Sequence, residues 1–181
     1  MIEKIVSGGQ TGADRGGLDA AIELGIPHGG WCPRGRKAED GRIPERYELR
    51  ETLTSAYAER TERNVVDSCG TVIFTPGPPT GGSAATVEMA RKYRRPYLLI
   101  DVETEQDYTA ARMLREWVEL EQIRVLNVAG SRASKAPGLD EWVRKILIDA
   151  LRWDAGAPPP RPEPTGTMGL GTSDTPLPED G

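Results

Sequence analysis

Reactive side chains are scarce in this sequence of 181 residues, which contains two cysteines and one histidine. Cys32 and Cys69 lie far apart and neither belongs to a C-x-x-C pair, so the sequence predicts neither a disulfide framework nor a zinc site. We expect both thiols to stay reduced. His28 is the only histidine available for Cys-His or Ser-His-Asp chemistry, and no motif surrounds it. A structural or ligand-lining role is favoured over that of a catalytic base.

Long apolar runs and an excess of positive charge are also missing. No segment approaches the roughly 18 apolar residues of a membrane span, and the N-terminus lacks the pattern of a secretory signal. We therefore expect a cytoplasmic protein with no membrane partner. The net charge of −5 and the pI near 5.1 argue against duplex nucleic acid as a partner, because binding to a phosphate backbone needs a basic surface. A small anionic molecule can still bind at a locally basic site.

Apolar patterns of strands and helices alternate along residues 1–153, which predicts one α/β domain with a largely parallel sheet. From residue 154 to 181 the chain is rich in Pro, Gly and Thr, and we expect a disordered tail because this composition cannot offset the entropy lost on ordering. The polar segment 32–46 reads as a long loop. The predicted strands are 2–6, a short one after Pro27, 71–74, 96–101 and 124–129, and the predicted helices are 14–24, 55–67, 86–93, 108–120 and 139–151.

Glycine-containing turns follow three of these strands, at residues 8–17, 77–83 and 130–132. Glycine allows a tight turn and leaves backbone N–H groups free to face an anion beside the positive end of a helix. Because the carboxyl ends of parallel strands meet at one edge of the sheet, a ligand is expected there. Each turn alone could be a plain strand-to-helix connection, but three together predict a shared phosphate site.

The absence of two motifs excludes or disfavours two classes of ligand-binding protein. No Gly-Lys-Ser or Gly-Lys-Thr occurs, which excludes P-loop kinases and ATPases. The first turn is not a full G-x-G-x-x-G and no acid follows about 20 residues later, which disfavours NAD. The candidate ligand and phosphate-binding residues are Gly8, Gly9, Gln10, Thr11, Gly12, Asp14, Arg15, Arg34, Gly81, Gly82, Ser83, Ser131 and Arg132, with Arg60 and Asn64 as further candidates.

Several of these side chains have a second interpretation. Asp14 at the start of a helix is either a cap or dipole partner or a group that holds a metal through water, and we predict no direct metal ligands. Ser83 is expected to be a helix N-cap and a phosphate donor. Glu88, one and a half turns into the next helix, is either a catalytic base or ribose ligand, or a surface acid. Tryptophans on the late helices suit either the core or the interface of a homo-oligomer: Trp117, Trp142 and Trp153.

These motifs together resemble one known family. The similarity rests on residues 7–21, 29–41, 57–65, 80–84 and 127–138, and covers nearly the whole chain up to residue 153. The chain resembles the molybdenum carrier proteins, the circularly permuted branch of the YpsA-type families within the SLOG superfamily. The resemblance implies a Rossmann-like three-layer sandwich that binds the molybdenum cofactor, a phosphate-bearing pterin, and passes it to a molybdoenzyme.

The wider superfamily implies an alternative. Its nucleoside-monophosphate hydrolases carry the motif P-G-G-x-G-T-x-x-E, and the corresponding stretch here keeps Gly81, Gly82 and Glu88 but has Thr80 and Ala84 in place of the proline and the third glycine. We therefore expect a non-catalytic carrier of a molybdopterin-type cofactor or a nucleotide. A phosphoribohydrolase-like enzyme that uses Glu88, or a sensor of a nucleotide-derived ligand, remains the alternative.

Overall fold

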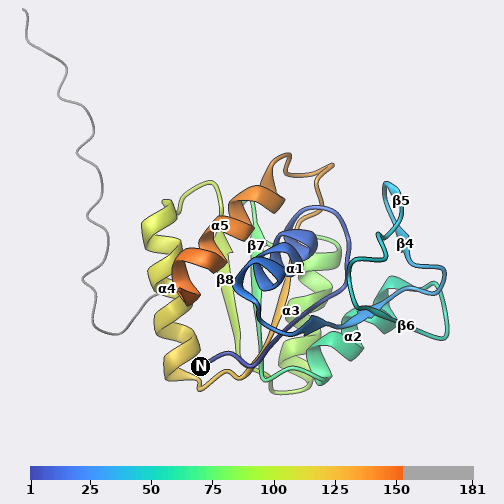
Figure 1. Ribbon diagram of the computed structural model, residues 1–181, viewed down its shortest axis with the longest axis horizontal. Coiled ribbons are helices and arrows are strands. Elements are labelled where there is room, and N and C mark those ends of the chain that lie inside the picture. The colour runs from blue at the N-terminus through green and yellow to red at the C-terminus, as the bar shows by residue number, and fades with distance from the viewer. Residues whose placement is uncertain (153–181) are drawn as a thin grey trace, which may run out of the picture.

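Residues 1–152, which the computed structural model describes, surround a five-stranded sheet with helices on both faces (Figure 1). Its strands are β1 (Lys4–Ser7), β2 (His28–Gly29), β7 (Gly70–Thr75), β8 (Tyr97–Asp101) and β9 (Val125–Gly130). They lie in the order β2-β1-β9-β7-β8, and every neighbouring pair is parallel. The predicted α/β class and Rossmann-like sandwich are confirmed. The tail predicted for 154–181 lies outside the described residues.

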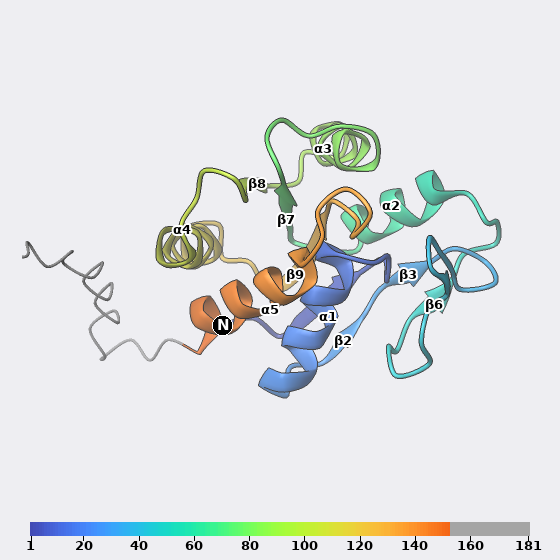
Figure 2. The same ribbon diagram turned by 90° about the horizontal axis from the view of Figure 1, so that it is seen from above.

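Two layers of helices cover the sheet, as the view from above shows (Figure 2). One layer consists of α1 (Ala13–Leu24), α4 (Asp107–Leu120) and α5 (Leu139–Leu151), with α5 packed against both others. The other layer consists of α2 (Tyr57–Val66) and α3 (Gly82–Lys92). Because both faces of the central strands are covered, side chains such as Phe74, Leu126 and Val128 are fully buried.

The strand order is a circular permutation of the order found in dinucleotide-binding folds. Numbered along the chain, the five sheet strands lie in the order 2-1-5-3-4. If the last strand, β9, is counted first, the same sheet reads 3-2-1-4-5, which is the order of a doubly wound fold. The order reverses between β9 and β7, and ligands of such sheets bind beyond the carboxyl ends of the strands at this switch point.

The helix α5 has the predicted bounds, whereas α3 begins four residues before the predicted start at Thr86. Gly81, with φ of 54°, is the residue that precedes the first turn of α3. Ser83 therefore lies inside the helix, and the prediction that it is the N-cap is wrong. Strand β8 is an edge strand of the sheet, and its Leu99 is 37% exposed.

Residues 31–51, which include the predicted long loop 32–46, contain short paired strands that pack beside α1. Strands β3 (Trp31–Cys32) and β6 (Arg50–Glu51) pair in parallel, and β4 (Lys37–Ala38) and β5 (Gly41–Arg42) form an antiparallel hairpin. A second small core holds this lobe against Leu18 of α1. Arg36 is buried in the lobe and donates hydrogen bonds to the carbonyl groups of Ile43, Pro44 and Tyr47. No helix within residues 1–152 has the length and apolar character needed to cross a membrane.

Two of the tryptophans considered for a subunit interface pack on the core of the domain. Trp142 meets the ring of Phe74 edge-on, with 6.0 Å between ring centroids, and its indole N–H donates to Asp107 at 2.7 Å. Trp117 is partly buried against the same core. Trp153 lies outside the described residues. Core packing therefore accounts for Trp117 and Trp142.

Candidate ligand-binding site

A cavity of about 310 Å³ lies at the carboxyl ends of the parallel strands. The turns after β1, β7 and β9 all contribute to its lining, as expected from the parallel sheet. One side of α2 completes it. The predicted candidates that line the cavity are Gly8, Gln10, Asp14, Arg60, Asn64, Gly81, Gly82, Ser83, Ser131 and Arg132. The structure therefore brings together residues from all three glycine-containing turns.

The start of α3 gives one part of the cavity the character of an anion site. The first N–H groups of a helix have no acceptor within the helix, and they form the positive end of its dipole. Gly82 and Ser83 belong to this first turn and line the cavity. Lys135 lies across from it, with its Nζ donating to Thr80 Oγ1 at 3.2 Å. This arrangement presents donors and a cation to the same space.

Two hydroxyl groups in the lining are available for a ligand. Ser83 and Ser131 are only 4% and 8% exposed. Within residues 1–152 neither hydroxyl makes a hydrogen bond, although the Ser131 backbone donates to Phe74 and accepts from Ala13. Neither oxygen is among the buried side-chain atoms of the described residues that lack a partner. Both hydroxyl groups are therefore free to donate to an oxyanion bound in the cavity.

A buried ion pair forms another part of the lining. Arg60 Nη1 lies 2.6 Å from Asp14 Oδ2, and the two side chains are 14% and 7% exposed. The backbone N–H of Gln10 donates to the same carboxylate oxygen at 3.2 Å. Burial raises the pKa of Asp14, and the positive charge of Arg60 opposes this rise. Arg60 Nε is buried without an acceptor among the described residues.

Gly8 is required for this pair because its Cα approaches the guanidinium closely. A Cβ atom at Gly8 would lie 1.5 Å from Arg60 Nη1. Gly12 is required for a different reason: its φ is +75°, and a Cβ there would lie 2.4 Å from the carbonyl oxygen of Ser131. Glycine at these positions thus serves close packing of the turns, in addition to any role toward an anion.

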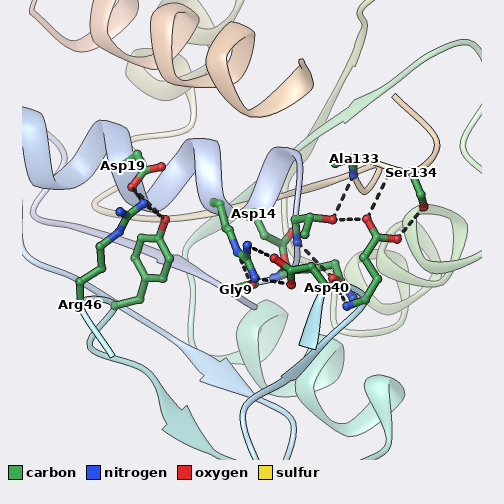
Figure 3. Close-up of polar contacts among 12 residues, drawn as sticks. Gly9, Asp14, Asp19, Asp40, Arg46, Ala133 and Ser134 are labelled. Atoms are coloured by element: carbon green, nitrogen blue, oxygen red, sulfur yellow. Dashed lines mark hydrogen bonds and ion pairs between the residues drawn. The ribbon is translucent and has the colours of Figure 1, made fainter. Parts of the chain in front are cut away.

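The hairpin β4–β5 holds the turns after β1 and β9 together (Figure 3). Glu39 accepts hydrogen bonds from the hydroxyl groups of Thr11 and Ser134, and from the backbone of Ser134 at 3.1 Å. Burial acts to raise the pKa of Glu39, but these hydrogen bonds and the charge of Arg132 lower it overall. Arg15 binds Asp40 through two nitrogens, at 2.6 and 2.8 Å. Thr11 and Arg15, predicted as ligand residues, thus contact the hairpin and do not line the cavity.

The remaining predicted residues lie elsewhere. Gly9 packs beside Leu49, Gly12 packs against the turn after β9, and neither lines the cavity. Arg34 and Glu88 are exposed and also lie outside the lining. The structure therefore does not bring Glu88 to the cavity, and its catalytic role stays a prediction. Within residues 1–152 no group of three or more His, Cys, Asp or Glu side chains is placed to hold a metal ion.

Some lining residues were not among the predicted candidates. They are Tyr57, Thr61, Thr80, Thr86, Asn127, Val128, Ala129, Gly130 and Lys135. Glu39, which fixes two of the turns, was missed as well. Of these residues, Lys135 could have been predicted, because it follows the third glycine turn closely and residues at the carboxyl ends of parallel strands gather at one edge of the sheet. A single sequence contains no comparable signal for Glu39.

Because the strand order is permuted, the turn that corresponds in position to the dinucleotide-binding motif is not the first turn of this chain. With β9 counted first, the turn after β9 takes the place where G-x-G-x-x-G stands in NAD-binding folds. This turn contains Gly130 followed by Ser131, Arg132, Ala133 and Ser134, and so it lacks the fingerprint. The argument against classical NAD binding, made from the first turn, therefore also applies to the structurally corresponding turn.

The fold and the cavity define a permuted Rossmann-like protein with a candidate site at the switch point of its sheet. The model of the Circularly permutated YpsA SLOG family matches residues 5–151. The chain therefore belongs to this family, as the resemblance predicted.

One solved structure supports the same relationship. It is the crystal structure of a protein described as a putative molybdenum carrier protein from Syntrophus aciditrophicus SB. The two sequences are 49% identical, the match covers 83% of this chain and 95% of that chain, and the TM-score is 0.81. A comparison with curated proteins found no match.

Proposed function

We propose that this chain is a non-catalytic carrier that binds a molybdopterin-type cofactor, or a nucleotide of related chemistry, in the cavity at the switch point. The observation that carries the proposal is the convergence of three turns and a helix N-terminus on one cavity. Its volume of about 310 Å³ lies within the range of about 300–1,000 Å³ found for small-molecule sites. Family membership and the name of the similar structure support molybdenum carriage.

The charges of the lining suit an anionic ligand. Arg60, Arg132 and Lys135 contribute positive charge, and Asp14 is the only acidic side chain among the lining residues. The protein as a whole carries a net charge of −5, so the cavity is locally basic on an acidic protein. The Ser83 N–H donates to the carbonyl oxygen of Thr80, so a phosphate beside the first turn of α3 would receive hydrogen bonds from the Gly82 N–H and from the Ser83 hydroxyl.

Carriage requires binding and release without a chemical step. In this proposal the molybdenum is part of the cargo, and the protein holds the phosphate and the organic frame. Ser83 and Ser131 contribute hydroxyl donors, and the half-exposed Arg132 side chain contributes positive charge to the lining. The proposed activity is protection and delivery of the ligand.

A charge reversal at the helix start tests the proposal. A side chain at Gly82 would meet nothing within 4 Å, and its φ is not in the left-handed region. Gly82→Asp should fold normally, because an acid in the first turn of a helix is favourable, but it places a carboxylate where the phosphate would bind. Gly82→Asn is the matched neutral control.

The measurement is native mass spectrometry of freshly purified protein, with molybdenum determined by elemental analysis and pterin by fluorescence after oxidation. Wild type and Gly82→Asn should carry the cofactor or bind it when it is supplied, and Gly82→Asp should not. Saturating cofactor should also raise the melting temperature of wild type. If the wild type shows no shift, or if Gly82→Asp retains the ligand, the proposal is wrong.

The hydrolase alternative has no support from the position of Glu88, which is exposed outside the cavity. It would predict release of free base from a nucleoside monophosphate and loss of this release in Glu88→Gln. The cytoplasmic location, a homo-oligomer and a recipient molybdoenzyme stay predictions from the sequence.

A further inference from the structure

The lining of the cavity contains one feature that a phosphate site does not explain, the buried carboxylate of Asp14. It is 7% exposed in its side chain and lies in the same lining as the proposed anion site. An ionised carboxylate repels phosphate, so the part of the ligand near Asp14 must donate hydrogen bonds. We propose that Asp14 accepts a hydrogen bond from the exocyclic NH₂ group of a 2-amino-4-oxopyrimidine ring, the group shared by pterins and guanine. This inference rests on the proposed function, because it assigns the other end of the same ligand.

The hydrogen bonds to Asp14 leave it able to accept more. Both the Arg60 guanidinium and the Gln10 backbone donate to Oδ2. A carboxylate has about four acceptor positions on its two oxygens. Even with the Gly8 backbone nearby, Oδ1 can accept a further donor. Because Oδ2 already accepts two hydrogen bonds, the proposed contact is a single one, from the NH₂ group to Oδ1.

An aromatic side chain lies near Arg60, the partner of this carboxylate. Tyr57, the first residue of α2, lines the cavity and is 39% exposed. The Arg60 guanidinium lies 5.8 Å from the centre of the Tyr57 ring and bridges toward Asp14. Exposed aromatic rings are surfaces on which flat heterocycles stack. Tyr57 and Asp14 together therefore match a ring that stacks on one face and donates from one edge.

The part of the cavity that is proposed to bind phosphate is formed by contacts that do not involve Asp14. At the start of α3, Thr80 contacts Lys135, and a side chain at Gly81 would approach the same lysine at 3.6 Å. Asp14 and Arg60 take no part in those contacts. The cavity therefore has a part that donates to an anion and a part that accepts from a ring. A phosphorylated pterin or guanosine monophosphate has both complementary groups.

Matched ligand pairs test the role of Asp14. Guanosine monophosphate has an exocyclic NH₂ group that inosine monophosphate lacks. Pterin has the same group, and in lumazine an oxygen replaces it. Dissociation constants measured by calorimetry with wild type should favour at least one aminated member about tenfold or more, because the other leaves a buried acceptor unpaired. A preference confined to one pair identifies pterins or guanine nucleotides as the source of the ring.

Variants then assign the preference to specific side chains. Asp14→Asn should bind the two members of a pair within about twofold of each other, while inorganic phosphate binds as in wild type. Tyr57→Leu should weaken the ring ligands of either kind by about tenfold or more without changing the binding of inorganic phosphate. Asp19→Asn is the control: Asp19 lies on the same helix, contacts Arg46 and Tyr47, and does not line the cavity.

The wild-type comparison decides the question even if Asp14→Asn does not fold. Equal affinity within both ligand pairs overturns the inference about Asp14, while phosphate-dependent binding of the same ligands leaves the proposed carrier function intact. An unchanged preference in folded Asp14→Asn also overturns it. If the wild type binds neither inorganic phosphate nor any phosphorylated probe or cofactor, the proposed function fails as well.

Discussion

Gly8→Ala provides a direct test of the buried ion pair. The new Cβ would lie 1.5 Å from Arg60 Nη1 and 2.4 Å from Arg60 Cζ, so the guanidinium must move away from Asp14. The φ of Gly8 is not positive, so alanine adds no backbone strain. The expected effect is therefore the loss of one interaction, the ion pair between Arg60 and Asp14, whose atoms lie 2.6 Å apart.

The magnitude follows from the burial of the pair. Breaking a buried ion pair so that one charge is left alone costs about 3–5 kcal/mol. The Arg60 side chain keeps 14% exposure and borders a cavity, so we expect the lower limit, about 3 kcal/mol. For a domain of this size, about 1 kcal/mol lowers the melting temperature by about 2–4 °C. The expected decrease for Gly8→Ala is therefore about 6–12 °C.

A double-mutant cycle identifies the cause. Free energies of unfolding are measured at pH 7 by guanidinium denaturation for wild type, Gly8→Ala, Arg60→Met and the double variant. Each single variant leaves Asp14 unpaired and should lose about 3 kcal/mol, and the double variant should lose about 3 kcal/mol as well. Gly82→Ala is the control, because its side chain meets nothing within 4 Å. Additive losses in the double variant would refute the assignment of the clash to Arg60.

The other predictions concern charge. Lys135→Ala should weaken phosphate-bearing ligands and flatten the salt dependence of their binding, whereas Lys37→Ala, exposed and outside the cavity lining, should not. Burial raises the pKa of Asp14 above its ordinary value of 3.8. The folded state therefore favours the protonated carboxyl, and this contribution to the free energy of unfolding is lost as pH rises from 3.8 through the raised pKa. Melting curves of Asp14→Asn should lack this component. The pKa of Glu39 is lowered from 4.5, so its stabilising contribution is present above 4.5 and is lost as pH falls through the lowered pKa. Glu39→Gln should make the acid side of the stability profile less steep.

The sequence was sufficient to predict the features that depend on local pattern and on the rules of parallel sheets. The apolar strands, the helix α5 and the gathering of three glycine turns at one edge all follow from periodicity and from the shared direction of the strands. The start of α3 was misplaced because Gly81 and Gly82 read as turn residues, although Gly82 already belongs to the helix. Glycine is unfavourable within a helix but is tolerated at its first positions.

The contacts that shape the site could not be predicted, because they join residues far apart along the chain. Asp14 and Arg60 are separated by 46 positions, and Glu39 and Ser134 by 95. Their proximity depends on the strand order and on the fold of the lobe around β4–β5. The sequence does not reveal that β9, the last strand, lies in the middle of the sheet, since each strand pattern alone is compatible with several orders.

The central position of β9 links ligand binding to the folding of the whole domain. Strand β1 pairs with β2 and β9, and β7 pairs with β8 and β9, so within residues 1–152 only β9 joins the two halves of the sheet. It is also the strand whose turn brings Ser131 beside both Ala13 and Phe74. The cavity therefore requires β9 to lie between β1 and β7. A ligand that contacts all three turns stabilises this assembled state against global unfolding and not merely one loop, so hydrogen exchange should slow along β1, β7 and β9 together when the cavity is filled.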